Sequence, residues 1–129
     1  MLSLLQLDFA LDMMLESEGS NISLGQKQRL LLGRALLCDA DVYLLDEILS
    51  GVDVENEKII ISALIQLAST KIIICVTHHL QSIINAKEIY FMDNAMVIES
   101  GLHQQLHKKK GKYYEMFMEQ AKIIDYEAE

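Results

Sequence analysis

The sequence predicts an α/β fold built on a parallel sheet, with a helical piece at its N-terminus and a helical tail at its C-terminus. Two short apolar runs, VYLLD at 42–46 and KIIICVT at 71–77, have the length and composition of buried strands. A helix-length segment separates them, and strands that alternate with helices form parallel sheets through right-handed crossovers. Because both runs are almost continuously apolar, each strand is expected to be buried on both faces.

The residues before the first strand are expected to be mostly helical. Residues 2–15 place leucines and methionines at helical spacing, on an apolar face wide enough to need partners on more than one side. A polar loop at 16–21 follows this segment. A second helix is then expected from about Gly25 to Cys38.

The residues after the first strand continue the alternation. A helix is expected from about Val54 to Ala68, with Asp53 in the position of its N-cap. The turn Asn94-Ala95 joins the last two strands, and Asn94 can take the left-handed conformation there. This hairpin is expected to form the antiparallel margin of the sheet. The remaining elements are expected at 80–86 (a short helix), 88–93 and 96–99 (strands), and 101–124 (the helical tail).

Composition excludes several classes of protein. The net charge of −8 argues against a nucleic-acid partner, because phosphate backbones are bound by clustered lysine and arginine. No apolar run reaches the roughly 20 residues that span a bilayer. Two cysteines, Cys38 and Cys75, lie in apolar stretches and are expected to be buried free thiols in a reducing compartment. We therefore expect a chain that is itself soluble and lies on the cytoplasmic side.

Three ionisable side chains follow the predicted strands at the edge where ligands bind in parallel sheets. Asp46 and Glu47 end the first strand, and His78 follows the second. Asp46 suits Mg²⁺, which takes one or two carboxylates and keeps waters and phosphates for its other positions. Glu47 could polarise a water molecule. The alternative interpretation is that the acidic pair merely caps the next helix.

A second candidate site lies where the helix near residue 24 begins. Ser23, Gly25 and Gln26 surround a helix N-terminus, whose backbone N–H groups attract anions and phosphate above all. Ser23 and Gln26 also fit the S-x-x-Q capping box, which is the purely structural alternative.

From Gly19 to Gln120 the sequence resembles the C-terminal half of the nucleotide-binding domain of ATP-binding cassette (ABC) transporters. ISLGQKQRLLLGRALL is similar to the family's LSGGQ signature helix, and VYLLDE to its Walker B strand. SGVD is similar to the D-loop and VTHHL to the switch-histidine loop. The segments IYFMDNAMVIESGLHQQL and KGKYYEMFMEQ resemble the tail of exporter-type members. Four motifs in one order make the resemblance specific.

The resemblance implies a fragment of a P-loop NTPase-type ATPase domain that uses ATP and Mg²⁺. Asp46 would hold Mg²⁺ through water, Glu47 would be the general base, and His78 would contact the γ-phosphate. Asp53 would reach across a dimer interface. The implied organisation is a helical subdomain with the signature helix at 1–38, a core sheet at 39–101 and a helical tail at 102–129.

The resemblance also implies partners. Ser23, Gly25 and Gln26 would close over ATP held by a second nucleotide-binding domain, and a transmembrane domain would place the assembly at the cytoplasmic face of a membrane. The intact protein would couple ATP hydrolysis to movement of a solute across that membrane.

Two departures from the family pattern qualify these expectations. The 129 residues contain neither the Walker A loop, GxxxxGK[ST], nor the glutamine loop, so they look like a truncated domain that is inactive alone. Leu24 stands where the family usually has glycine, and the leucine side chain adds bulk beside the phosphate-binding residues. The alternative function is a non-catalytic interaction or self-association module.

Overall fold

The computed structural model describes residues 5–7 and 12–127, with side chains described as far as residue 122. The chain forms two compact units, which divide between His78 and His79. Unit one contains both candidate sites, and unit two contains the hairpin and the C-terminal helices.

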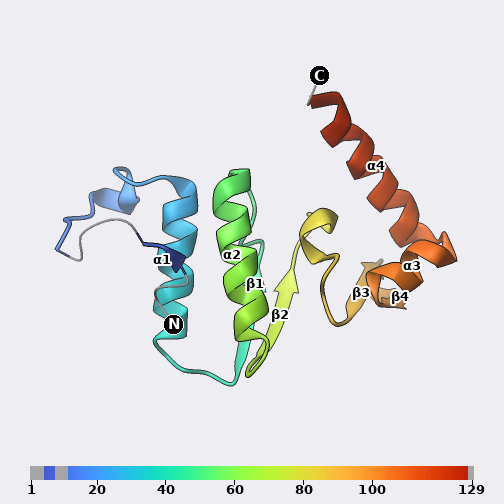
Figure 1. Cartoon of the computed structure of the whole chain (residues 1–129), viewed down its shortest axis with the longest axis horizontal. Helices are drawn as coiled ribbons and strands as arrows, with labels where there is room; N and C mark the ends of the chain where they lie inside the picture. The colour runs from blue at the N-terminus through green and yellow to red at the C-terminus, as the bar shows by residue number, and fades with distance from the viewer. Residues whose placement is uncertain (1–4, 8–11, 128–129) are drawn as a thin grey trace. The chain divides into compact units, whose positions relative to one another are not determined.

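Unit one packs two helices against a parallel pair of strands (Figure 1). Helix α1 is Leu24–Leu36 and helix α2 is Val54–Leu67. Strands β1 (Val42–Asp46) and β2 (Ile72–Val76) pair in register, with Leu44 opposite Ile74. These elements confirm the predicted α/β class and the predicted ends of the first strand. The buried core consists of Leu5, Leu32, Leu36, Tyr43, Leu45, Ile48, Leu49, Ile60, Ala63 and Leu67.

The expectation that both strands are buried on both faces is wrong. Burial alternates along β1, where Tyr43 and Leu45 are buried while Leu44 is 71% exposed. The helices cover one face of the pair, and no described element of unit one covers the other. The uncovered face, called here the open sheet face, carries Val42, Leu44, Ile72, Ile74 and Val76.

The helix expected over residues 2–15 is not formed where the structure describes that segment. Residues 5–7 and 12–15 are not α-helical, and the rest of the predicted helix lies outside the described residues. Leu5 is nevertheless fully buried, and the Arg29 guanidinium donates hydrogen bonds to the carbonyl oxygens of Leu5 (2.9 Å) and Gln6. Gln6 has a positive φ of 45°, which ends any helix there. A side chain of α1 therefore satisfies backbone groups that a helix would have paired.

Unit two is an antiparallel hairpin covered by two helices. The predicted sheet margin is wrong, because within the described residues β3 pairs with β4 in a separate two-stranded sheet. The hairpin has its own core of Leu80, Ile89, Leu106 and Tyr113, which is why it forms a distinct layer. The elements are η3 (Leu80–Ile83), β3 (Ile89–Asp93), β4 (Met96–Gly101), α3 (His103–Lys109) and α4 (Lys112–Glu127).

Two helices of unit two differ from their predicted extent. The helix expected at 80–86 is only the 3₁₀ turn η3. The predicted tail breaks into α3 and α4 at Lys110, whose φ of 54° is left-handed, and Gly111. A Cβ at Gly111 would overlap the Glu99 carboxylate, whose Oε2 accepts the Tyr113 backbone N–H at 2.8 Å. The break therefore lets Glu99 cap the first turn of α4.

Two smaller features of the described chain complete the fold. Cys75 is partly buried but Cys38 is exposed, so the expected burial of both thiols is wrong for Cys38. Cys38 follows the end of α1, beyond the stripe that faces the core. Within the described residues, no helix combines the length and apolar character needed to cross a bilayer.

Candidate functional site

Strands β1 and β2 bring Asp46, Glu47 and His78 to one edge of the sheet. The two strands are parallel, so their carboxyl ends meet, and Asp46 lies opposite Val76. The Glu47 backbone N–H donates to the Val76 carbonyl oxygen at 2.9 Å, which carries the pairing one residue beyond β1. His78 Nδ1 lies 2.8 Å from Glu47 Oε2. The structure therefore brings together the three ionisable residues that the sequence predicted at this edge.

Glu47 holds its place through an uncommon backbone conformation. Its φ is +50°, in the left-handed region that costs a non-glycine residue about 1 kcal/mol or more. This turn directs the carboxylate toward the end of β2 instead of continuing the strand. Glu47 and His78 have side chains 38% and 59% exposed, so a ligand can reach both.

The electrostatics of this edge are negative. Partial burial raises the pKa of the Cys75 thiol, and the Glu47 and Asp46 carboxylates raise it further. The same negative potential favours a cation beside Asp46, which is exposed at the end of β1. An exposed carboxylate at a strand end fits the partial, water-rich coordination of Mg²⁺. The donor chemistry present therefore fits that metal.

The second group of predicted residues lies at the beginning of α1. Ser23 is the N-cap, and its Oγ accepts the Gln26 backbone N–H at 3.1 Å. Gln26 Oε1 accepts the Ser23 backbone N–H at 2.9 Å, which completes the capping box. In this structure Ser23 and Gln26 therefore form the capping box that the sequence offered as the purely structural alternative.

Helix α2 begins beside α1 and supplies the fourth predicted residue. Asp53 is the N-cap of α2, as predicted, and accepts the backbone N–H of Asn56 at 3.0 Å and its Nδ2 at 2.6 Å. These bonds lower the pKa of the Asp53 carboxyl. A Cβ at Gly25 would collide with the Asn56 side chain, so glycine allows the two helix ends to approach.

A surface hollow of about 360 Å³ lies beside these two helix ends. It is mostly polar, and Ser23, Gln26 and Asn56 contribute side chains to it. Sequence reasoning missed Asn56 and Arg29, which both line this hollow. One sequence signal could have identified Arg29, because it is a charged residue on the buried side of α1.

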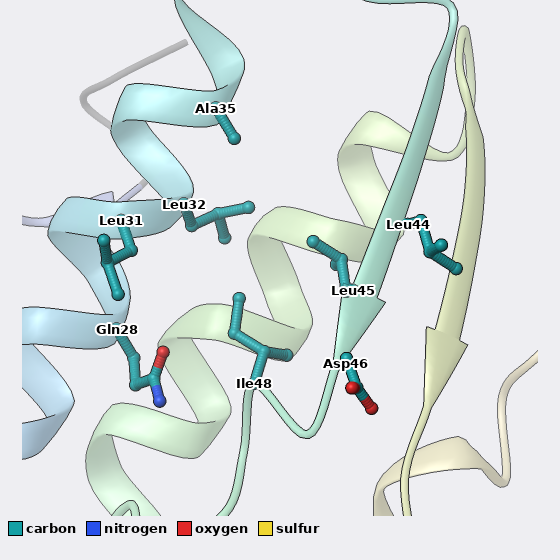
Figure 2. A pocket seen from close by; sticks show the side chains of 8 residues that line it. All are labelled: Gln28, Leu31, Leu32, Ala35, Leu44, Leu45, Asp46 and Ile48. Carbon is teal, nitrogen blue, oxygen red and sulfur yellow. The ribbon is translucent and has the colours of Figure 1, made fainter.

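A smaller hollow of about 170 Å³, lined mainly by leucine, isoleucine and alanine residues, lies between α1 and β1 (Figure 2). Leu32 and Ala35 project from α1 toward β1, and Leu45 projects back toward the helices, whereas Leu44 points to the opposite side. Asp46 and Gln28 are its polar members.

Leu24 lies against the loop that precedes α2. A Cβ at Gly51 would lie 3.0 Å from Leu24 Cδ2, and Gly51 has a φ of +68°. The leucine is 45% exposed and begins α1 directly after the Ser23 cap. Its side chain therefore occupies space between the two predicted ligand-binding segments.

Comparison with known proteins connects this arrangement to one family. The sequence profile of the ABC transporter family matches residues 1–50. An ABC transporter ATP-binding protein of Haemophilus influenzae, itself uncharacterized, is 46% identical over 110 residues. That alignment covers 85% of this chain and 20% of the relative. The ABC multidrug transporter mdr1 of Aspergillus fumigatus is 45% identical over 105 residues, which cover 81% of this chain and 8% of the relative.

A solved structure is similar as well. A bacterial Atm1-family ABC exporter with ATP bound superposes with a TM-score of 0.73 at 33% identity. The match covers 80% of this chain and 18% of the exporter chain. In each of these comparisons the chain spans a fifth or less of the other protein.

Proposed function

The chain belongs to the ABC transporter family, and on that premise we propose that it is the C-terminal part of an ATPase domain that couples ATP hydrolysis to transport. One observation carries the proposal: the Glu47 carboxylate and the His78 imidazole meet at the end of a parallel strand pair, beside Asp46. Phosphoryl transfer depends mainly on positioning and electrostatics, and this edge offers both.

We assign each residue at the edge one role. Asp46 would hold Mg²⁺ through water, and the metal when bound would neutralise charge on the phosphates. Glu47 accepts the proton of the attacking water, for which its carboxylate must be ionised. His78 holds Glu47 through the 2.8 Å contact and presents its other ring nitrogen to the γ-phosphate.

The residues at the starts of α1 and α2 would act on a second nucleotide site. Ser23 Oγ accepts a hydrogen bond from Gln26, which leaves the hydroxyl hydrogen for donation to phosphate. Gly25 and Gln26 present the helix N-terminus to the same anion. Asp53 lies at the adjoining helix end and would reach the partner domain.

The proposed partners come from the similarity to ABC exporters. A second nucleotide-binding domain, identical or related, would hold the ATP that Ser23, Gly25 and Gln26 cover. A transmembrane domain would carry the solute, with the ATPase at the cytoplasmic face of the membrane. The exporter among the similar structures favours export.

The test supplies this chain with a segment that contains the P-loop and glutamine loop, joined as one domain. We expect magnesium-dependent ATP turnover in the joined domain, and its loss in Glu47→Gln with ATP binding retained. Glu57→Gln, on α2, is the matched control and keeps turnover. The 129-residue chain alone is expected to give no turnover. Turnover by the chain alone that Glu47→Gln abolishes would contradict its assignment as an incomplete site.

Leu24 offers a second test in the same joined domain. Its side chain lies against Gly51 and adds bulk where a phosphate must approach the helix N-terminus. We expect Leu24→Gly to raise turnover, whereas Leu31→Gly farther along α1 only lowers stability, by about 1 kcal/mol. Unchanged or lower turnover in Leu24→Gly would show that the leucine does not impair the signature.

The alternative function is a non-catalytic interaction module, and the open sheet face favours it. Contiguous exposed apolar surface commonly marks an interaction site. Failure to recover ATPase activity with any P-loop-bearing segment, together with stable association through this face, would favour the module.

A further inference from the structure

Asn56 lies in the first turn of α2 and is bonded to the residue that caps this helix. Its backbone N–H donates to Asp53 Oδ1 at 3.0 Å, and its side-chain Nδ2 donates to Asp53 Oδ2 at 2.6 Å. An ionised carboxylate only accepts hydrogen bonds, so the nitrogen of the Asn56 amide must face Asp53. Asn56 Oδ1 is buried and has no hydrogen-bond partner among the described residues. Asp53 therefore sets the orientation of the Asn56 side chain.

The same side chain lies against the beginning of α1. Gly25 is buried there, and a Cβ placed on it would lie 2.4 Å from Asn56 Cγ and 2.6 Å from Asn56 Cβ. Rotation of the Asn56 side chain would move Cγ but not Cβ, because Cβ is attached directly to the backbone of α2. A larger residue at position 25 would therefore have to move one helix away from the other.

We propose that Asn56 is a positioning residue that sets Asp53 and Gly25 relative to each other. One side chain holds the carboxylate at the start of α2 by hydrogen bonds and the backbone at the start of α1 by contact. All three residues belong to unit one. The consequence for catalysis rests on the proposed function: the two segments assigned to a second nucleotide site would meet it as one preformed surface. The positional claim does not depend on that function.

An exchange of glycine between the two helices tests the contact. Gly25→Ala should lower the urea midpoint of the 129-residue chain, because its methyl group collides with Asn56. The loss should be smaller in an Asn56→Ala background, and it should vanish in Asn56→Gly, which removes Cβ as well. Leu31→Ala, at an exposed position on α1, is the control and should change the midpoint equally in all three backgrounds.

An NMR titration of the Asp53 carboxyl group tests the link to the cap. The hydrogen bonds from Asn56 lower the pKa of Asp53. Asn56→Ala keeps the backbone bond and loses the Nδ2 bond, so the pKa of Asp53 should rise part of the way toward its ordinary value of 3.8. Gly25→Ala should also raise this pKa, although the change is on the other helix, because it displaces Asn56. Leu31→Ala should leave the pKa of Asp53 unchanged.

Two outcomes overturn the positional claim. The first is an equal loss of urea midpoint from Gly25→Ala in the native and Asn56→Gly backgrounds, which would show that the methyl group does not meet Asn56. The second is an unchanged pKa of Asp53 in Gly25→Ala, which would show that the two helix ends are set independently. If Gly25→Ala alone does not fold, recovery of folding on addition of Asn56→Gly supports the claim, and failure to recover overturns it.

A kinetic measurement tests the catalytic consequence in the joined domain. We expect Asn56→Ala to lower kcat severalfold with the KM for ATP unchanged, because the segment with the P-loop would hold the nucleotide. Asn56→Ser keeps a hydrogen-bond donor in the first turn of α2 and should recover part of kcat. An unchanged kcat in Asn56→Ala overturns the catalytic consequence. If Glu47→Gln has no effect on turnover, the proposed function fails instead, and the urea midpoints and the pKa of Asp53 still decide whether Asn56 positions the two helix ends.

Discussion

At the scale of single residues, Glu47 combines a proposed chemical role with a local conformational cost. The left-handed backbone aims its carboxylate at His78, and its N–H still bonds to Val76. Strain of this kind persists where contacts with the surrounding structure hold the residue in place, and it is common at functional sites. Glycine would relieve the strain but would remove the carboxylate.

A pair of variants separates the strain from the side chain. Glu47→Gly and Glu47→Ala both lose the contact with His78, but only glycine adopts the left-handed conformation without cost. We expect Glu47→Gly to be more stable than Glu47→Ala by about 1 kcal/mol, measured by urea denaturation. The same pair at Glu57, inside α2, should give the opposite order by about 1 kcal/mol. Equal stability of the two Glu47 variants would show that the backbone there is not strained.

The meeting of the ionisable residues was predictable, whereas their detailed placement was not. Parallel strands bring their carboxyl ends together, so positions in the sequence place Asp46, Glu47 and His78 at one edge. The approach of Gly25 to Asn56 depends on how two helices pack, and no periodicity within either helix encodes it.

At the scale of elements, the helix caps are strongly encoded in the sequence. Asp53 and Ser23 cap α2 and α1 as their spacing predicts, because an N-cap interaction reaches only three residues. Elements that depend on distant contacts were harder to predict. The break before α4 follows from Glu99 on β4, and η3 ends early within a unit-two core that the local sequence does not reveal.

The cap of α2 predicts a pH dependence of stability. The Asn56 hydrogen bonds lower the pKa of Asp53 below its ordinary value of 3.8. Asp53 therefore contributes stability above about pH 3.8, and this contribution is lost as pH falls through the lowered pKa. We expect the advantage of the native chain over Asp53→Asn, measured as urea midpoint, to shrink as acid is added. Glu55→Gln, in the same turn, removes a charge without removing a cap bond and should not reproduce this effect.

The hairpin of unit two predicts a stabilising substitution. Both turn residues have positive φ, 48° at Asn94 and 60° at Ala95, as in a type I′ turn. The sequence indicated the left-handed conformation for Asn94, but Ala95 adopts it too. We expect Ala95→Gly to raise the free energy of unfolding by about 1 kcal/mol, measured by hydrogen exchange of β3 and β4 amides. Lower protection of those amides would contradict the turn assignment.

At the scale of the whole molecule, the open sheet face explains the largest failure of the sequence prediction. The apolar runs 42–46 and 71–77 have the composition of strands covered on both sides, but helices cover only one side in unit one. The apolar composition of a strand indicates that both of its faces can be buried. It does not indicate which element or which chain buries them.

The open sheet face predicts self-association of the isolated chain. Five large apolar side chains, between 49% and 71% exposed, lie on one face of the two-stranded sheet, and such surfaces associate or aggregate. We expect the double variant Leu44→Thr with Ile74→Thr to shift the sedimentation profile toward monomer across a concentration series and to bind less of a hydrophobic dye. Both changes keep strand propensity and lie outside the core, so stability should change by only about 0.5 kcal/mol.

A substitution on the opposite face is the matched control. Leu45→Thr lies on the same strand, but its side chain belongs to the buried core of unit one. We expect it to cost about 2 kcal/mol or more of stability and to leave the open sheet face intact, so any folded fraction still self-associates. If the double variant associates as strongly as the native chain, association uses another surface, and the interaction-module alternative loses its main support.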